Sequence, residues 1–161
     1  MKDIIKELNS DKVFLKIIDE FVKNNDVQEM KNYRQHYDTS CYEHCLVASY
    51  YSYKICKIFG WDYVAVARAS MVHDLFLYDW RRRQDDRKGL HAFTHPKTAY
   101  ENASKIFDLN KKEQDIIEKH MWPLTITKFP RYKESFVLSC VDKYCALRES
   151  FSSIFSKKPK K

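Results

Sequence analysis

The chain has 161 residues, of which 44% are apolar and 15% aromatic, while only two are glycine and four are proline. This length is typical of one domain that buries its own core, and the scarcity of turn-forming residues favours packed helices over a sheet, so we predict an all-α protein. The formal charge is +7, but without the four lysines of the last five residues it falls to +3, which is too little to indicate nucleic acid as a partner.

The sequence contains no apolar stretch of the roughly 18 residues needed to span a bilayer, so we expect no membrane partner. Its first residues lack the apolar segment of a secretory leader, so we expect no secretion. The five cysteines are an odd number and show no paired zinc-finger spacing; they are Cys41, Cys45, Cys56, Cys140 and Cys145. These features predict reduced thiols used in packing and a cytoplasmic location. The oligomeric state is not predicted.

Two amphipathic helices are predicted in the first sixty residues. Apolar side chains recur every three or four positions over 13–22, the spacing of one helical face. Ser40 and Glu43 have the spacing of a capping box, so a second helix is expected over about 41–59. His44 lies in its first turns and faces the core together with apolar residues.

A third helix is predicted to follow Asp62, which is a suitable N-cap. Its sequence is rich in alanine, which would let another helix approach closely. Its end is the apolar run "MVHDLFLYDW", residues 71–80, in which two polar side chains interrupt a pattern typical of a core. These are His73 and Asp74, and both are capable of binding a metal ion.

The second half of the chain begins with a charged stretch, about 78–94, which has no helical period and is predicted to be a loop bordering a site. Pro96 suits the first position of the next helix, so His95 is expected just outside the helix start. Asn110 caps a further helix, which His120 closes.

In the last helix we predict an apolar stripe of Phe136, Val137, Cys140, Val141 and Tyr144, with Asp142 at its margin.

Six polar residues lie at or near the ends of these helices. They are His44, His73, Asp74, His95, His120 and Asp142. Burying a single unpaired carboxylate or imidazolium costs several kcal/mol. If all six side chains converge on metal ions, coordination offsets this cost for all of them together. Mixed imidazole and carboxylate ligands suit iron, manganese, zinc, cobalt or nickel. Six candidates exceed the needs of one ion, which predicts two divalent metal ions with a shared carboxylate.

The order of these residues resembles the HD-domain metal-dependent phosphohydrolases. That family is defined by a histidine, a His-Asp doublet about thirty residues later and a later aspartate, and its two-metal members add two histidines between the doublet and the last aspartate. In this chain the matching residues are His44, His73, Asp74, His95, His120 and Asp142. The resemblance spans about 40–150. "MWPLT" follows His120, where the cyclic-di-GMP phosphodiesterase branch has Gly-Tyr-Pro, so that branch is not indicated.

The resemblance implies a helical HD domain over 36–152, an N-terminal helical extension over 1–35 and a basic tail over 153–161. It also implies that one ion is held by His44, His73, Asp74 and Asp142. Asp74 would be the catalytic residue, bridging to a second ion held by His95 and His120. The expected function is hydrolysis of a small phosphate ester or nucleotide by a metal-bridged hydroxide.

Candidates for substrate binding come from the residues near these ligands. Arg81 and Arg82 belong to an arginine run whose planar guanidinium groups suit phosphate, although a charge run is more often a solvated surface. Lys143 follows Asp142 and could reach a phosphate at the rim of the site. Asp79 could be a general acid or a solvated loop residue.

Two other functions use the same residues. Mixed-valent di-iron oxygenases related to this family bind their irons with four histidines and two aspartates, so the ligand set alone does not separate hydrolysis from oxygen chemistry. A third hypothesis is a metal-stabilised binding module without catalytic activity, whose lysine-rich tail engages nucleic acid or an anionic membrane.

Overall fold

The computed structural model describes residues 2–36, 39–81 and 89–156, and it confirms the all-α prediction. Its helices are α1 (Lys2–Ser10), α2 (Lys12–Lys23), α3 (Asn25–Glu29), the 3₁₀ helix η1 (Met30–Asn32), α4 (Cys41–Ile58), α5 (Tyr63–Met71), α6 (His91–Ala103), α7 (Lys111–Lys119) and α8 (Lys133–Ser156). Two short strands, β1 (Arg34–His36) and β2 (Thr39–Ser40), form an antiparallel pair. No helix of the described ranges has both the length and the apolar character to cross a membrane.

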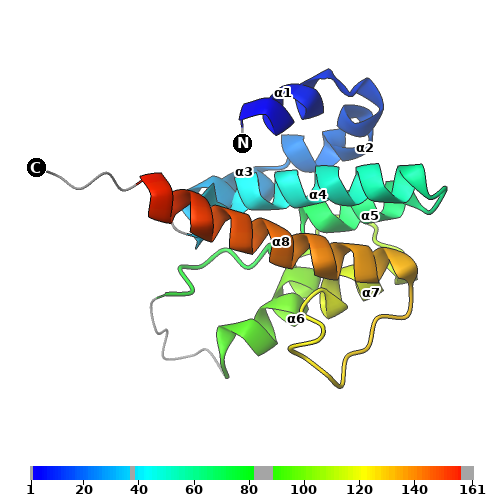
Figure 1. Cartoon of the computed structure of the whole chain (residues 1–161). Helices are drawn as coiled ribbons and strands as arrows, with labels where there is room; N and C mark the ends of the chain where they lie inside the picture. Colours follow the sequence, from blue (N-terminus) through cyan, green and yellow to red (C-terminus); the bar gives the residue numbers. More distant parts are fainter. Residues whose placement is uncertain (1, 37–38, 82–88, 157–161) are drawn as a thin grey trace, which may run out of the picture.

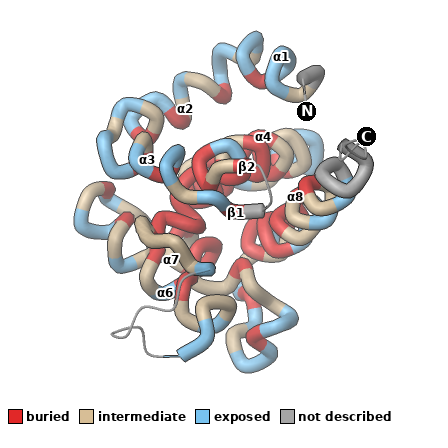
Figure 2. The backbone as a smooth tube through the Cα atoms, turned by 90° about the vertical axis from the view of Figure 1, so that its left-hand side faces the viewer, coloured by how far each residue is buried: buried red, intermediate tan, exposed pale blue. Residues whose placement is uncertain are grey.

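Helix α4 lies at the centre of the molecule. It packs against α5 and α8, and Figure 1 shows α8 running beside it in the opposite direction. The N-terminal helices α1, α2 and α3 lie on one side of this layer, where they contact α4 or α5, and α6 and α7 lie on the other. The backbone in Figure 2 is buried mainly along α4 and α8. This central layer therefore holds the core, and the candidate ligands lie where it meets α6 and α7.

The helix starts follow the capping signals in the sequence. Asp11 accepts hydrogen bonds from the backbone N–H groups of Val13 and Phe14, which begins α2. Both bonds of the predicted capping box join Ser40 and Glu43, so α4 begins as expected. The N-cap Asp62 and the Asn110 capping box likewise begin α5 and α7.

Small residues let α4 and α5 pack closely. Ala65, Ala67 and Ala69 on α5 are all buried. The Ser49 hydroxyl on α4 donates a 2.7 Å hydrogen bond to the backbone carbonyl of Ala67, which requires the two helices to be in direct contact. Helix α5 ends at Met71, so the chain turns before it reaches the His-Asp doublet.

One prediction of helix geometry is wrong and another is right only in part. Helix α6 starts at His91, so Pro96 lies in its second turn and His95 lies inside the helix, not before it. A proline there removes only one backbone hydrogen bond near the helix start, which the helix tolerates.

The predicted apolar stripe of α8 is buried only in part. Val137 and Val141 are buried, whereas Cys140 and Tyr144 are exposed. The buried face of α8 also carries polar residues, among them Asp142, and these displace the stripe from the side that faces the core.

Candidate metal centre

The six predicted ligands come from five separate segments of the chain. His44 lies near the start of α4, the doublet His73 and Asp74 follows α5, His95 lies in α6, His120 caps the end of α7, and Asp142 lies in α8. Every one of them is buried, and none is more than 8% exposed. The structure therefore brings together all six residues that the sequence singled out.

The ligand atoms form two groups that share one residue. His44, His73, Asp74 and Asp142 form the first group, and Asp74, His95 and His120 form the second. Within each group all ligand atoms lie within 4.8 Å of one another. A single metal ion can contact several ligands only when they are this close, so each group has the size of one metal site.

The carboxylate of Asp74 is divided between the two groups. Its Oδ2 lies 3.5 Å from the Nε2 of His73, in the first group. Its Oδ1 lies 3.2 Å from the Nε2 of His95 and 3.7 Å from that of His120, in the second group. In the first group the Oδ1 of Asp142 lies 3.0 Å from the Nε2 of His44. Asp74 thus has the position of a bridging ligand.

The backbone fixes which nitrogen of three imidazole rings points to the centre. Each ring holds its Nδ1 on a carbonyl oxygen three or four residues earlier, which can only accept a hydrogen bond, so the proton is on Nδ1. The pairs are His73 with Ser70 at 2.7 Å, His95 with His91 at 2.9 Å and His120 with Ile117 at 2.8 Å. Each Nε2 therefore points to the centre, where a metal ion could take the place of any proton that it carries.

Glu149 does the same for the fourth ring and was missed in the sequence. Its carboxylate oxygens lie 3.1 and 3.2 Å from the Nδ1 of His44, and its side chain is buried on α8. It lies seven residues after Asp142, two helical turns along the same face. This periodicity was the only signal in the sequence that could have identified it.

The structure also shows buried polar atoms that lack a hydrogen bond. Among the described residues, these include the Nε2 of His73 and the Oδ1 of Asp74. Leaving such atoms unpaired is costly, yet both have the chemistry of a divalent-metal ligand and both face the centre. The donor set therefore fits two metal ions, one in each group.

The site combines ionised carboxylates with imidazole rings that differ in charge. Burial opposes the charged forms of His44 and His73, but the neighbouring acidic groups raise the pKa of both well above the usual value. Burial opposes the charged form of Asp74, but the neighbouring His73 and His95 hold its pKa well below the usual value. Burial also opposes ionisation of Asp142, whose pKa is nevertheless lowered by hydrogen bonds with His44 and His73. Burial and the charges of His73 and His95 lower the pKa of His120 to about 3. The carboxylates are therefore ionised and His120 is neutral.

Gln35 is a second residue that sequence reasoning missed, and it comes from the predicted N-terminal extension. It lies on β1 and its Nε2 donates a hydrogen bond to the Oδ2 of Asp74. A carboxylate can only accept, so this contact fixes the amide with its nitrogen toward the centre. The segment before residue 36 thus contributes directly to the site, and no motif in the sequence indicated it.

A cavity of about 270 Å³ opens beside the second group of ligands. Besides metal-ligand candidates it is lined by Gln35, Trp80, His91, Ala92, Met121, Lys143 and Ala146. The Trp80 ring stacks on His91 with 12° between the planes, and His91 stacks on His95. His91 forms part of the wall and contacts the Tyr78 hydroxyl.

The candidate substrate-binding residues have different outcomes. Lys143 lines the cavity, but its Nζ donates to the His120 carbonyl oxygen and to Ser139. Arg81 is exposed and forms an ion pair with Asp79, and it is absent from the described lining of the cavity. Arg82 lies outside the described residues.

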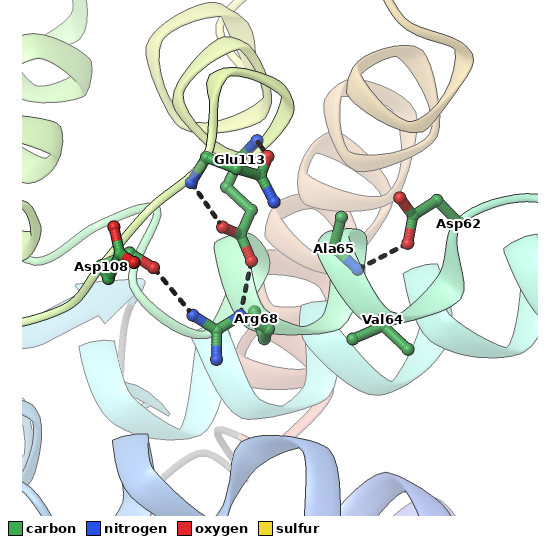
Figure 3. A pocket seen from close by; sticks show the side chains of 7 residues that line it. Asp62, Val64, Ala65, Arg68, Asp108 and Glu113 are labelled. Carbon is green, nitrogen blue, oxygen red and sulfur yellow. Dashed lines mark hydrogen bonds and ion pairs between the residues drawn. The ribbon is translucent and has the colours of Figure 1, made fainter.

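A separate cavity of about 310 Å³ lies between α5 and α7 (Figure 3). Arg68 crosses it, with its Nε 2.5 Å from Glu113 and its Nη2 3.1 Å from the carbonyl oxygen of Asp108. Arg68 also pairs with Glu20. Glu113 belongs to the capping box of α7 and Glu20 lies on α2, so these contacts join three helices and have a structural role.

Comparison with known proteins gave no match to a family model, to a curated protein or to a solved structure. A proposal for the function therefore rests on the residues of the candidate site.

Proposed function

We propose that this chain belongs to the HD-domain superfamily and is a metal-dependent phosphohydrolase that acts on a small phosphate ester or nucleotide. The observation that carries the proposal is the meeting of four imidazole Nε2 atoms and two carboxylates in two groups that share Asp74. A pair of cation sites of this kind can stabilise the phosphoryl group during hydrolysis of a phosphate ester.

One ion would be held by His44, His73 and Asp142. The other would be held by His95 and His120, and Asp74 would contact both ions. Iron, manganese, zinc, cobalt and nickel all suit this donor set. When bound, two such ions lower the pKa of a nearby water and neutralise the charge of the phosphoryl group. No side-chain nucleophile is then needed.

The chain's own residues prepare the site for this chemistry. Gln35 holds Asp74 and Glu149 holds His44, so the ligands keep one orientation. The cavity next to His95 and His120 gives a small substrate access to the centre, and its apolar wall of Trp80 and Met121 limits the water beside it. A substrate phosphate at the inner end of this cavity would lie beside Asp74.

The test combines metal analysis with phosphate release. We expect about two transition-metal ions per chain after anaerobic preparation and phosphate release from small monoesters with manganese or cobalt and without oxygen. Trace metal at most would contradict the two-metal centre. Activity that requires both iron and oxygen would instead support the oxygenase. Bound metal without either activity, together with salt-sensitive retention of nucleic acid that is lost on deleting 157–161, would support the binding module. A cytoplasmic location stays a prediction.

A further inference from the structure

We propose that the cavity beside the metal centre selects phosphate monoesters with a small, uncharged and apolar organic group, such as an aryl monophosphate, over polyol phosphates and polyphosphates. This inference rests on the proposed function and narrows its substrate class. It follows from the hydrogen bonds that the polar side chains of the cavity wall form within the chain, and from the apolar character of the rest of the wall.

Most polar contacts of the described lining, apart from the metal-ligand candidates, are made within the chain itself. The three N–H bonds of Lys143 are matched by three acceptors, the carbonyl oxygens of His120 and Ser139 and the Ser139 hydroxyl. His91 contacts the Tyr78 hydroxyl at 3.0 Å through its Nδ1. Gln35 donates from its Nε2 to Asp74, while its Oε1 has no hydrogen bond and could accept one. A single ligand hydroxyl could therefore donate to Gln35, but the several hydroxyls of a polyol would have to displace contacts within the protein.

The rest of this lining is apolar. The apolar side chains are those of Trp80, Ala92, Met121 and Ala146. The indole N–H of Trp80 donates to the carbonyl oxygen of Arg34 at 3.2 Å, on the strand β1 that also carries Gln35. The polar edge of the indole is therefore hydrogen-bonded within the chain. Burial of an organic group against these side chains would be driven by the loss of apolar surface from water.

Charge and volume set the other two limits. Because Lys143 has its donors engaged, no described cation of the lining is left to pair with a second phosphate, whereas one phosphate is neutralised by the metal centre. A volume of about 270 Å³ lies below the range usual for pockets that bind drug-sized ligands, so the organic group is small. One ring is therefore a better fit than an extended nucleotide.

The first experiment compares phenyl phosphate, glycerol phosphate and adenosine triphosphate with the manganese-loaded protein. We expect kcat/KM for phenyl phosphate to exceed both others at least tenfold. The Trp80→Ala variant should lower the ratio of kcat/KM for phenyl phosphate to that for methyl phosphate about tenfold, mainly through KM, because part of the apolar contact is lost. Trp61→Ala removes a tryptophan that stacks on Phe59, outside the cavity lining, and should leave this ratio unchanged.

A binding measurement separates this inference from the proposed hydrolysis. Phenylphosphonate cannot be hydrolysed at its P–C bond, and calorimetry should show that it binds at least tenfold more tightly than methylphosphonate, with the difference lost in Trp80→Ala. If this holds but no ester is hydrolysed, the phosphohydrolase proposal fails and the ligand class stands. If esters are hydrolysed but glycerol phosphate or adenosine triphosphate is preferred, or Trp80→Ala keeps the wild-type discrimination, the ligand class is wrong.

Discussion

The Nε2 atoms of His95 and His120 face each other at a distance of 2.8 Å, while both rings keep their Nδ1 protons on backbone carbonyls. At this distance the two Nε2 atoms must share a proton or a cation, because two lone pairs directed at the same point repel each other. A metal ion between the rings and Asp74 would replace that proton by coordination. The pair is therefore arranged to bind a cation.

This relationship predicts the effect of removing one ring. His120→Ala should lower the bound metal from about two ions to about one per chain, because the first group of ligands is left intact. Elemental analysis of the purified variant measures the loss. Lys111→Ala changes an exposed residue at the start of the same helix α7 and is the control, and it should keep both ions. Equal metal loss in the two variants would rule out the second site.

Asp74 has a larger predicted effect because it belongs to both groups. Asp74→Ala should lose both ions and all phosphatase activity. Metal analysis and a phosphate-release assay on the same preparation measure the two losses. Asp79→Ala removes an aspartate paired with Arg81 and should retain the metal. The bridging role fails if Asp74→Ala keeps two ions with wild-type affinity.

Glu149 should act as a positioning residue through His44. Glu149→Ala removes the acceptor that holds the Nδ1 proton, so metal affinity in competition with a chelator should fall about 10- to 100-fold. Glu149→Gln keeps an oxygen acceptor and should recover most of the affinity. Glu101→Ala on the exposed face of α6 is the control. Wild-type affinity in Glu149→Ala would show that the contact does not support the metal.

Asp115 provides a prediction for stability and pH that does not involve the metal. Burial opposes its ionisation, but Lys119, the backbone N–H of Arg131 and the Ser135 hydroxyl lower its pKa. A lowered pKa in the folded state stabilises the protein above the unfolded value of about 3.9, and the contribution is lost as the pH falls through the folded value. Asp115→Asn should reduce the free energy of unfolding at pH 7 by about 1–3 kcal/mol.

Urea unfolding of both proteins over a series of pH values tests this. The difference between wild type and Asp115→Asn should be constant from pH 7 to about 5 and shrink below about pH 4. Asp19→Asn, which breaks an exposed pair with Lys23, should change the stability little at any pH. A difference that grows on acidification would contradict the assignment.

The fold and much of the site could be predicted because local signals specified them. A capping box depends on two residues close in sequence, such as Ser40 and Glu43. Its two hydrogen bonds form between these residues alone and need no contact with a distant part of the chain. The candidate ligands could be identified because a histidine or aspartate in an apolar run needs a partner. His73 and Asp74 illustrate this, since both are fully buried and both belong to a group of side chains that could hold a metal ion.

What the sequence did not show depends on contacts between distant segments. Gln35 and Asp74 are 39 residues apart, and a glutamine in a short polar stretch has no feature that marks it. The apolar stripe of α8 was right only in part, because the buried face of the helix carries Asp142 and Glu149, whereas Tyr144 is exposed. A polar site inside the core reverses the usual relation between apolar residues and burial. The start of α6 was predicted wrongly for a different reason. Pro96 suits the first position of a helix, but here it lies within a helix that starts at His91.

The contact between His44 and Glu149 closes a loop of 105 residues, and the metal ligands lie inside this loop. Ions bound there would act as crosslinks, since they remove much of the freedom of the unfolded chain. Loss of the ions would then release α4, α6, α7 and α8 from one another at the same time. A cell short of the metal would accumulate a loosened chain that proteases can attack, so the supply of metal would control how long the protein survives as well as whether it is active.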